Sequence, residues 1–428
     1  MAKILRARAP PGLKATLGID ERGARLSASK TRHPLREATF RALWSASLIA
    51  SLGTWAQTVG GAWLMTTLTS DALPVALIQS AITLPSVLFG LPAGSLADRV
   101  DRRWLLIATQ TWMLLSAAAL AILTWLGLVT PWLLLALTFS LGVGSALSGP
   151  TWSSLLPDVV SRPQLPSAVI VNSLGYNVAR SVGPSLGGVV FAAVGPAGTF
   201  VANALSCVAP IGVLSRMRPL PRAHSSSSSE RFLDTLRGGL FFARTDPTQR
   251  VVLTRSILWM LCASSLWSLL PLIARYELGL DVPGYGFLVT CVGGGAVLGA
   301  FALPFLRERW TSNRLLMGAI VCFSAMLLVL AWVRLLPLVW LMLGLGGAAW
   351  TQSNQNFQIA VQLAAPGFVR ARAIASYLLT FQGGQAIGSA IWGSVAERVG
   401  DPLALTLAAA GLVLGLIAAN RWPVEDPT

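Results

Sequence analysis

The sequence predicts an all-α membrane protein with twelve transmembrane helices in two pseudo-symmetric six-helix bundles. Three observations support this prediction: charge-free stretches of bilayer length, basic residues gathered on one side of those stretches, and a likeness between the two halves. The chain of 428 residues is 54% hydrophobic and only 11% charged, whereas soluble domains average about 25% charged residues. A soluble protein this apolar would lack polar side chains to cover its surface.

The charge-free stretches are long enough to cross a bilayer, which requires about 20 predominantly apolar residues for each helix. Two stretches are long enough for two helices each, and we divide them at the turn signals Gly127 to Pro131 and Gly195-Pro196. The twelve predicted spans are residues 41–65, 73–97, 104–126, 131–152, 165–194, 197–216, 253–274, 284–306, 314–333, 337–362, 371–396 and 402–421.

A polar segment, residues 217–250, separates six spans from the other six. It contains the run Ser225–Ser229, which is typical of a flexible linker. Residues 230–246 then place apolar side chains at helical spacing between arginines, which predicts an amphipathic helix on the membrane surface. The predicted organisation is a basic N-terminal arm over 1–40, a first bundle over 41–216, the linker over 217–250, a second bundle over 251–422 and a tail over 423–428. The arm is expected to be disordered, or to result from a start codon placed too early.

The distribution of basic residues predicts the orientation in the membrane. With both termini in the cytoplasm, 28 of the 32 Lys and Arg fall in cytoplasmic segments and 3 fall outside. Cytoplasmic loops of membrane proteins show this excess. We therefore expect a multi-pass protein of the inner membrane, with the net charge of +15 facing anionic lipid rather than nucleic acid.

The two halves resemble each other when the chain is shifted by 205 residues. The shift aligns the fifth span with the eleventh and pairs Gly183 with Gly388, Gly188 with Gly393, and Gly195 with Gly400. Such symmetry between six-helix halves is typical of carriers that rock around a central site. The alternative is a chance alignment of helices rich in glycine and alanine.

The loop between the second and third spans reads GSLADRVDRR, from Gly94 to Arg103. It resembles the signature G-x-L-A-D-R-x-G-R-R of the major facilitator superfamily, with Asp101 in place of the second glycine. Gly94 would let the second span approach a neighbouring helix closely. The resemblance implies a cytoplasmic gate formed by Gly94, Asp98, Arg99, Arg102 and Arg103. The alternative is that the acidic residues cap the third span and the arginines only fix its topology.

A second motif, GPSLGG, lies in the fifth span at Gly183, Pro184, Gly187 and Gly188. It resembles the G-P-x-x-G-G core of exporters in the same superfamily. A proline within a helix bends it, and glycines allow close packing against a neighbour. The resemblance implies a bend that favours export, and the alternative is ordinary helix packing.

Arg180 precedes this motif by one turn and lies near the middle of the membrane. An arginine there costs several kcal/mol unless it faces a polar cavity or a partner. No Asp or Glu lies within any predicted span, so carbonyls, amides, water or an anionic ligand must satisfy it. We expect a substrate cavity that includes Arg180, Tyr176, Asn177, Gln355, Gln358 and Gln382. The alternative is a purely structural network of hydrogen bonds.

Segments beginning at His33, Thr130 and Tyr377 resemble a bacterial branch of the superfamily called transmembrane secretion effectors, which includes the enterobactin exporter. The resemblance covers roughly residues 33–421. It implies export of a siderophore, drug or secondary metabolite by alternating access, as an antiporter with protons. An importer of the same fold and a non-transporting receptor or scaffold are the alternatives.

We expect no enzymatic activity, no cofactor and no bound metal, and we expect a monomer with membrane lipid around it. Lysine occurs only at positions 3, 14 and 30, which excludes a phosphate-binding G-x-x-x-x-G-K-[ST] loop. His33 and His224 both lie outside the spans, which excludes an intramembrane zinc site built on histidine.

Overall fold

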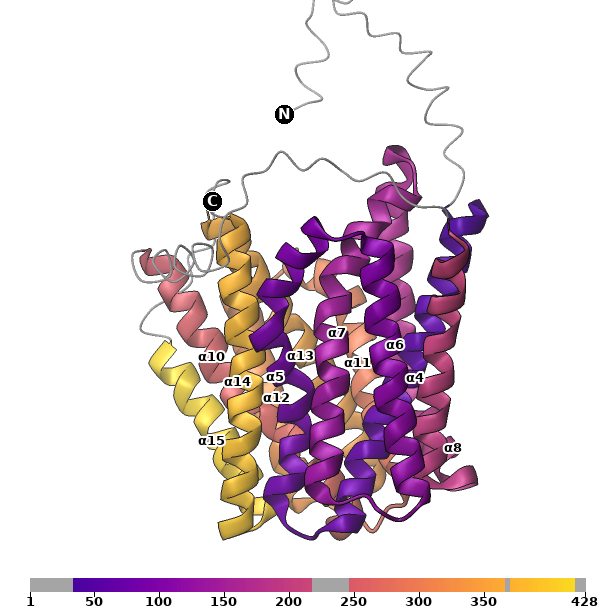
Figure 1. Ribbon diagram of the computed structural model, residues 1–428. Helices are drawn as coiled ribbons and strands as arrows, with labels where there is room; N and C mark the ends of the chain where they lie inside the picture. The colour runs from indigo at the N-terminus through magenta and orange to yellow at the C-terminus, as the bar shows by residue number, and fades with distance from the viewer. Residues whose placement is uncertain (1–33, 218–245, 366–369, 420–428) are drawn as a thin grey trace, which may run out of the picture.

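The computed structural model describes residues 34–217, 246–365 and 370–419. These residues form membrane-spanning helices in two bundles of six, as the sequence predicts (Figure 1). Most of the predicted N-terminal arm, the predicted amphipathic helix and the C-terminal tail lie outside the described residues.

The first bundle contains a short 3₁₀ helix before its first span (Pro34–Arg36) and another before its fifth (Arg162–Gln164). Its long helices are α4 (Ala38–Leu68), α5 (Ala72–Arg99), α6 (Arg102–Trp125), α7 (Pro131–Val159) and α8 (Leu165–Arg216). The backbone of α8 leaves helical geometry at Gly195, so this one element makes the fifth and sixth spans. The Gly195-Pro196 turn signal therefore identified the correct boundary.

The second bundle consists of six further long helices. They are α10 (Pro247–Leu272), α11 (Val282–Arg307), α12 (Ser312–Trp332), α13 (Leu336–Ala364), α14 (Arg370–Val399) and α15 (Asp401–Ala419). A π-helical turn over Ile273–Glu277 extends α10. Helix α10 begins inside the segment predicted as linker, because Asp246 accepts a hydrogen bond from the Gln249 amide at 2.7 Å and Pro247 suits the first helical turn.

Length and composition alone qualify seven helices of the described chain as candidate membrane spans. Helices α4, α13 and α14 are not among them, and the described part of α15 counts only as a shorter apolar helix. These three helices contribute hydroxyl, amide and indole groups to an internal cavity described below, which lowers their mean hydropathy. A helix that is polar on one face in a membrane protein points that face at the bundle interior.

The two ends of the helical bundle differ in charge. We call one the basic end. Helices α6, α8 and α12 begin there and α11 ends there, close in the sequence to Arg102, Arg103, Arg162, Arg307 and Arg314. We call the other the opposite end. It contains the turn between α4 and α5 and the break within α8. In Figure 1, α4, α6 and α8 of the first bundle lie at the right, α10, α14 and α15 of the second lie at the left, and α5 lies next to α14.

The halves meet where α5 packs against α14 and where the first span of α8 packs against α11. Equivalent glycines make these contacts. A Cβ atom built on Gly188 would lie 2.8 Å from the Val282 carbonyl oxygen of α11, and one on Gly393 would lie 3.0 Å from the Leu73 Cα of α5. The internal repeat predicted from the sequence is therefore a repeat of contacts as well.

The paired turns of the repeat also match. Gly195 has φ 77° and Gly400 has φ 86°, and each ends the helix that carries the repeated sequence. An L-residue with a side chain strains at such positive φ values, whereas glycine does not. Chance alignment does not account for glycines that share both a position in the repeat and this uncommon backbone geometry.

Candidate substrate cavity

A cavity of about 820 Å³ lies between the two halves. Helices α4, α5, α6, α7 and α8 line it from the first bundle, and α10, α11, α13 and α14 line it from the second. Binding sites for small organic molecules typically enclose about 300–1,000 Å³, so this volume suits a substrate of that class.

Five of the six residues predicted for the cavity line it. They are Tyr176, Asn177, Arg180, Gln355 and Gln382. Gln358 is not among the lining residues. It lies nearly one turn closer to the basic end of α13 than Gln355, and its side chain is exposed there.

Arg180 is the one charged residue among the lining residues that the structure describes. Its Nε atom is buried without a hydrogen-bond acceptor in the described chain. Nearby, Tyr176 faces Trp55 with ring centroids 6.4 Å apart, and the Asn177 amide donates to the Ser173 carbonyl at 2.8 Å. The guanidinium therefore lies in a polar, aromatic cavity in which no described carboxylate neutralises it.

Several lining residues were not predicted from the sequence. Amides and indoles from six helices reach the cavity: Gln79, Gln110, Trp152, Trp267, Trp350 and Gln385. Single amides in otherwise apolar spans were the available signal for Gln79 and Gln110. The tryptophans offered no such signal, because an indole suits both a buried core and a binding site.

Hydrogen bonds and ring contacts close the cavity at the opposite end. Arg275 of the α10 extension donates from Nη1 to the Thr66 hydroxyl at 3.0 Å, and the Tyr276 hydroxyl donates to the Thr66 carbonyl at 3.1 Å. The Arg275 guanidinium also lies 5.6 Å from the ring centre of Trp63, which stacks on Tyr285 at 5.8 Å. These groups join α4 of the first bundle to α10 and α11 of the second.

The halves also touch midway along the bundle. The Ser80 hydroxyl of α5 donates to the Ala386 carbonyl of α14 at 2.7 Å, and Ser185 of α8 shares a 2.7 Å hydrogen bond with Thr290 of α11. Cavity-lining residues extend from this level toward the basic end as far as Ser47, in the third turn of α4.

At the basic end of α5, the expectation for Gly94 is not met. No described atom lies within 4 Å of a Cβ built on Gly94, or of one built on Gly90. The close contacts of α5 with α14 in the described structure lie nearer the opposite end, where Gly393 packs on Leu73 and Ala76. Contacts between the bundles therefore join the opposite end, and the cavity lining reaches toward the basic end as far as Ser47.

Two arginines of the loop between α5 and α6 bond to other helices of the first bundle. Arg102 forms an ion pair with Asp158 of α7 at 2.7 Å and donates to the Ser154 carbonyl at 3.1 Å. Arg103 donates to the carbonyls of Leu214 at 2.7 Å and Ser215 at 2.8 Å, at the end of α8.

Asp101, which replaces the expected glycine of that motif, caps α6 by accepting from the Arg103 amide at 2.9 Å. The alternative interpretation of this acidic residue as a helix cap is therefore correct. The side chains of Asp98 and Arg99 lie outside the described part of the structure.

The glycines of the GPSLGG motif make close contacts on two sides of α8. A Cβ atom on Gly183 would lie 2.6 Å from the Trp55 Cβ, and one on Gly187 would lie 2.6 Å from the Ala56 Cα, so both glycines pack on α4. Gly188 instead faces α11. Helix α8 continues through Pro184, and its non-helical backbone lies eleven residues later at Gly195.

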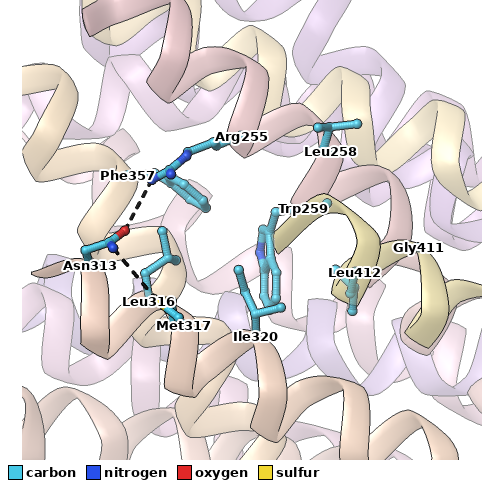
Figure 2. Close-up of a pocket in the computed structure, with 11 residues that line it drawn as sticks. Arg255, Leu258, Trp259, Asn313, Leu316, Met317, Ile320, Phe357, Gly411 and Leu412 are labelled. Carbon is cyan, nitrogen blue, oxygen red and sulfur yellow. Dashed lines mark hydrogen bonds between the residues drawn. The ribbon is translucent and has the colours of Figure 1, made fainter. Parts of the chain in front are cut away.

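A second hollow lies within the second bundle, between α10, α12 and α15 (Figure 2). Arg255 donates to the Asn313 side-chain oxygen at 3.4 Å, and the Asn313 amide lies 3.8 Å from the Met317 sulfur. Its volume of about 30 Å³ admits only a water or two, whereas an organic substrate needs ten times that. The cavity between the halves is therefore the candidate substrate site.

Comparison with known proteins agrees with this geometry. A family profile described as transmembrane secretion effector matches residues 29–427. The chain belongs to that family. Its members are transporters of the major facilitator superfamily, so this chain is a multi-pass membrane transporter.

Relatives of the family include transporters of several organisms. The chain is 25% identical over 262 residues to the staphyloferrin A transporter of Staphylococcus aureus, an alignment that covers 61% of this chain and 66% of that protein. It is 24% identical to the multidrug efflux pump Tap of Mycolicibacterium fortuitum, over 87% of this chain and 93% of the pump.

Solved transporter structures share the fold. A mutant of the nucleoside transporter NupG superposes with a TM-score of 0.74 and 17% identity, covering 90% of this chain and 99% of NupG. A bacterial homolog of the human lysosomal transporter Spinster gives a TM-score of 0.70 and 14% identity, covering 91% and 98%. These likenesses establish the twelve-helix architecture of two bundles.

Proposed function

We propose that this transporter exports a small organic molecule, such as a siderophore, drug or secondary metabolite, by alternating access. The observation that supports it most is the cavity between the halves, which Arg275 and Thr66 bridge at the opposite end and whose lining reaches toward the basic end. A substrate entering from the basic end would leave from the other side once the halves rock, which opens the contacts at Thr66.

The proposed direction of transport depends on assigning the basic end to the cytoplasm. Arginines crowd that end, and cytoplasmic loops carry such an excess. With this assignment, both termini and the loading side of the cavity would face the cytoplasm. The similarity to a multidrug efflux pump supports export, and the similarity to a staphyloferrin A transporter supports an organic substrate.

The proposal includes a gate at the basic end and a proton gradient as the energy source. Asp98 and Arg99 would close the basic end against the second bundle when the carrier opens outward, while Arg102 and Arg103 keep the first bundle rigid through the bonds described above. A proton gradient would drive the cycle, with a monomer as the working unit.

Deleting the gene in its native host, followed by mass spectrometry of retained metabolites, tests the export function. We expect one compound class to accumulate in deleted cells and to return to normal when the gene is restored. Inside-out vesicles should then take up that compound under a proton gradient. Uptake only by right-side-out vesicles would identify an importer, and no movement in either would leave a receptor or scaffold as the function.

A further inference from the structure

We infer that the cavity recognises organic acids, with Arg180 binding a carboxylate group of the substrate. This inference deepens the proposed transport function and rests on it. Its starting point is the charge balance of the site: among the lining residues that the structure describes, Arg180 is charged and no Asp or Glu accompanies it.

The hydrogen bonding of Arg180 leaves room for such a ligand. The guanidinium has five N–H donors, and a cation in the membrane interior is costly unless partners satisfy those donors. In the described chain, Arg180 makes no ion pair and its buried Nε atom lacks an acceptor. The fork of a guanidinium matches the two oxygens of a carboxylate, which would supply the missing acceptors and the missing negative charge.

The surroundings of Arg180 suit the rest of an organic acid. The aromatic rings of Trp55 and Tyr176 lie beside it on the cavity wall, and Gln355 and Gln382 face the same cavity from the second bundle. Aromatic faces bind the organic body of a ligand, and amides bind its remaining polar groups. A cationic compound would instead meet an uncompensated positive charge, which opposes its binding.

The position of Arg180 also connects binding to movement. A Cβ atom on Gly293 of α11 would lie 3.0 Å from the Arg180 carbonyl oxygen, so the two bundles meet at this residue. A substrate held by Arg180 and by the amides of α13 and α14 would contact both bundles at once. The rocking motion then carries the bound acid between the two sides of the membrane.

Equilibrium dialysis of the purified full-length protein tests this inference. The probes are 2-naphthoate, salicylate and citrate, each compared with its fully methylated ester (trimethyl citrate for citrate), which resembles the acid but has no carboxylate charge. We expect at least one acid to bind ten times more tightly than its ester. Arg180→Gln and Arg180→Met should reduce that preference below twofold, whereas Arg180→Lys, which keeps the charge, should retain part of it.

Arg309→Gln is the matched control, because Arg309 is an exposed residue at the basic end, outside the cavity lining. It removes the same charge and should leave the preference for the acid unchanged. The inference is overturned if no acid binds better than its ester, or if both neutral Arg180 variants, shown to be folded by thermal unfolding, keep the wild-type preference.

Transport measurements separate this inference from the proposed function. If vesicles export uncharged or cationic compounds while dialysis shows no preference for acids, the transporter is an exporter but Arg180 does not select carboxylates. If vesicles move none of the retained metabolites, the export function itself is wrong.

Discussion

Replacing Gly286 by alanine should shift the transporter away from the conformation described above. A Cβ atom on Gly286 of α11 would lie 2.6 Å from the Pro184 carbonyl oxygen of α8 and 3.2 Å from its carbonyl carbon. Ordinary contacts need at least about 3.5 Å, so the helices must separate by several tenths of an ångström. Overpacking of this kind costs about 1–3 kcal/mol, which corresponds to roughly a 5- to 150-fold change in the conformational equilibrium.

Gly294→Ala provides the matched control for this experiment. Gly294 lies on the same helix, yet no described atom lies within 4 Å of a Cβ built on it, so alanine there adds the same methyl group without a clash. Both substitutions favour the helix by about 0.5–1 kcal/mol, and the comparison cancels that effect.

Spin-label distances measure the shift. Labels at Leu128 and Leu335, which are 59% and 61% exposed in turns at the opposite end, report the separation of the two halves there. The background is a variant in which the four native cysteines are replaced. Gly286→Ala should increase the population at longer distances, and Gly294→Ala should not. Identical distance distributions for the two variants would refute the packing argument.

Three further predictions concern the gate, the repeat and the cavity. Asp98→Asn should abolish vesicle transport without lowering the amount of protein in the membrane, and normal transport would remove Asp98 from the gate. Gly195→Ala should lower the free energy of unfolding by about 1–2 kcal/mol, because alanine is strained at φ 77°. Gly212→Ala, at a helical position with open space around it, should not lower it. Thermal unfolding of the two variants measures the difference. Gln382→Ala should raise KM about 2- to 10-fold by removing one hydrogen bond to the substrate, while Gln358→Ala, outside the cavity lining, should leave KM unchanged.

The sequence predicted the helices well because membrane thickness and the cost of buried charge act on each span separately. The break at Gly195 was also predictable, since a glycine followed by proline marks a turn whatever its neighbours are. The relation between Gly195 and Gly400 followed from the internal repeat. These features can be predicted without knowing how the helices pack against one another.

Features that depend on lateral neighbours were harder to predict. The partner of Arg102 is Asp158, 56 positions away on α7, and no local pattern connects the two. Gln355 and Gln358 look equivalent in the sequence, but only the rotation and depth of α13 decide which of them reaches the cavity.

Labelling of a single cysteine at Ser47 tests the central claim most directly, because Ser47 lines the cavity toward the basic end. The Ser47→Cys variant, without its native cysteines, would be treated with a membrane-impermeant maleimide in vesicles of both orientations. If the cavity opens to the cytoplasm from the basic end, inside-out vesicles should be labelled rapidly and right-side-out vesicles should not. Labelling from the outer face alone would contradict both the orientation and the proposed loading side.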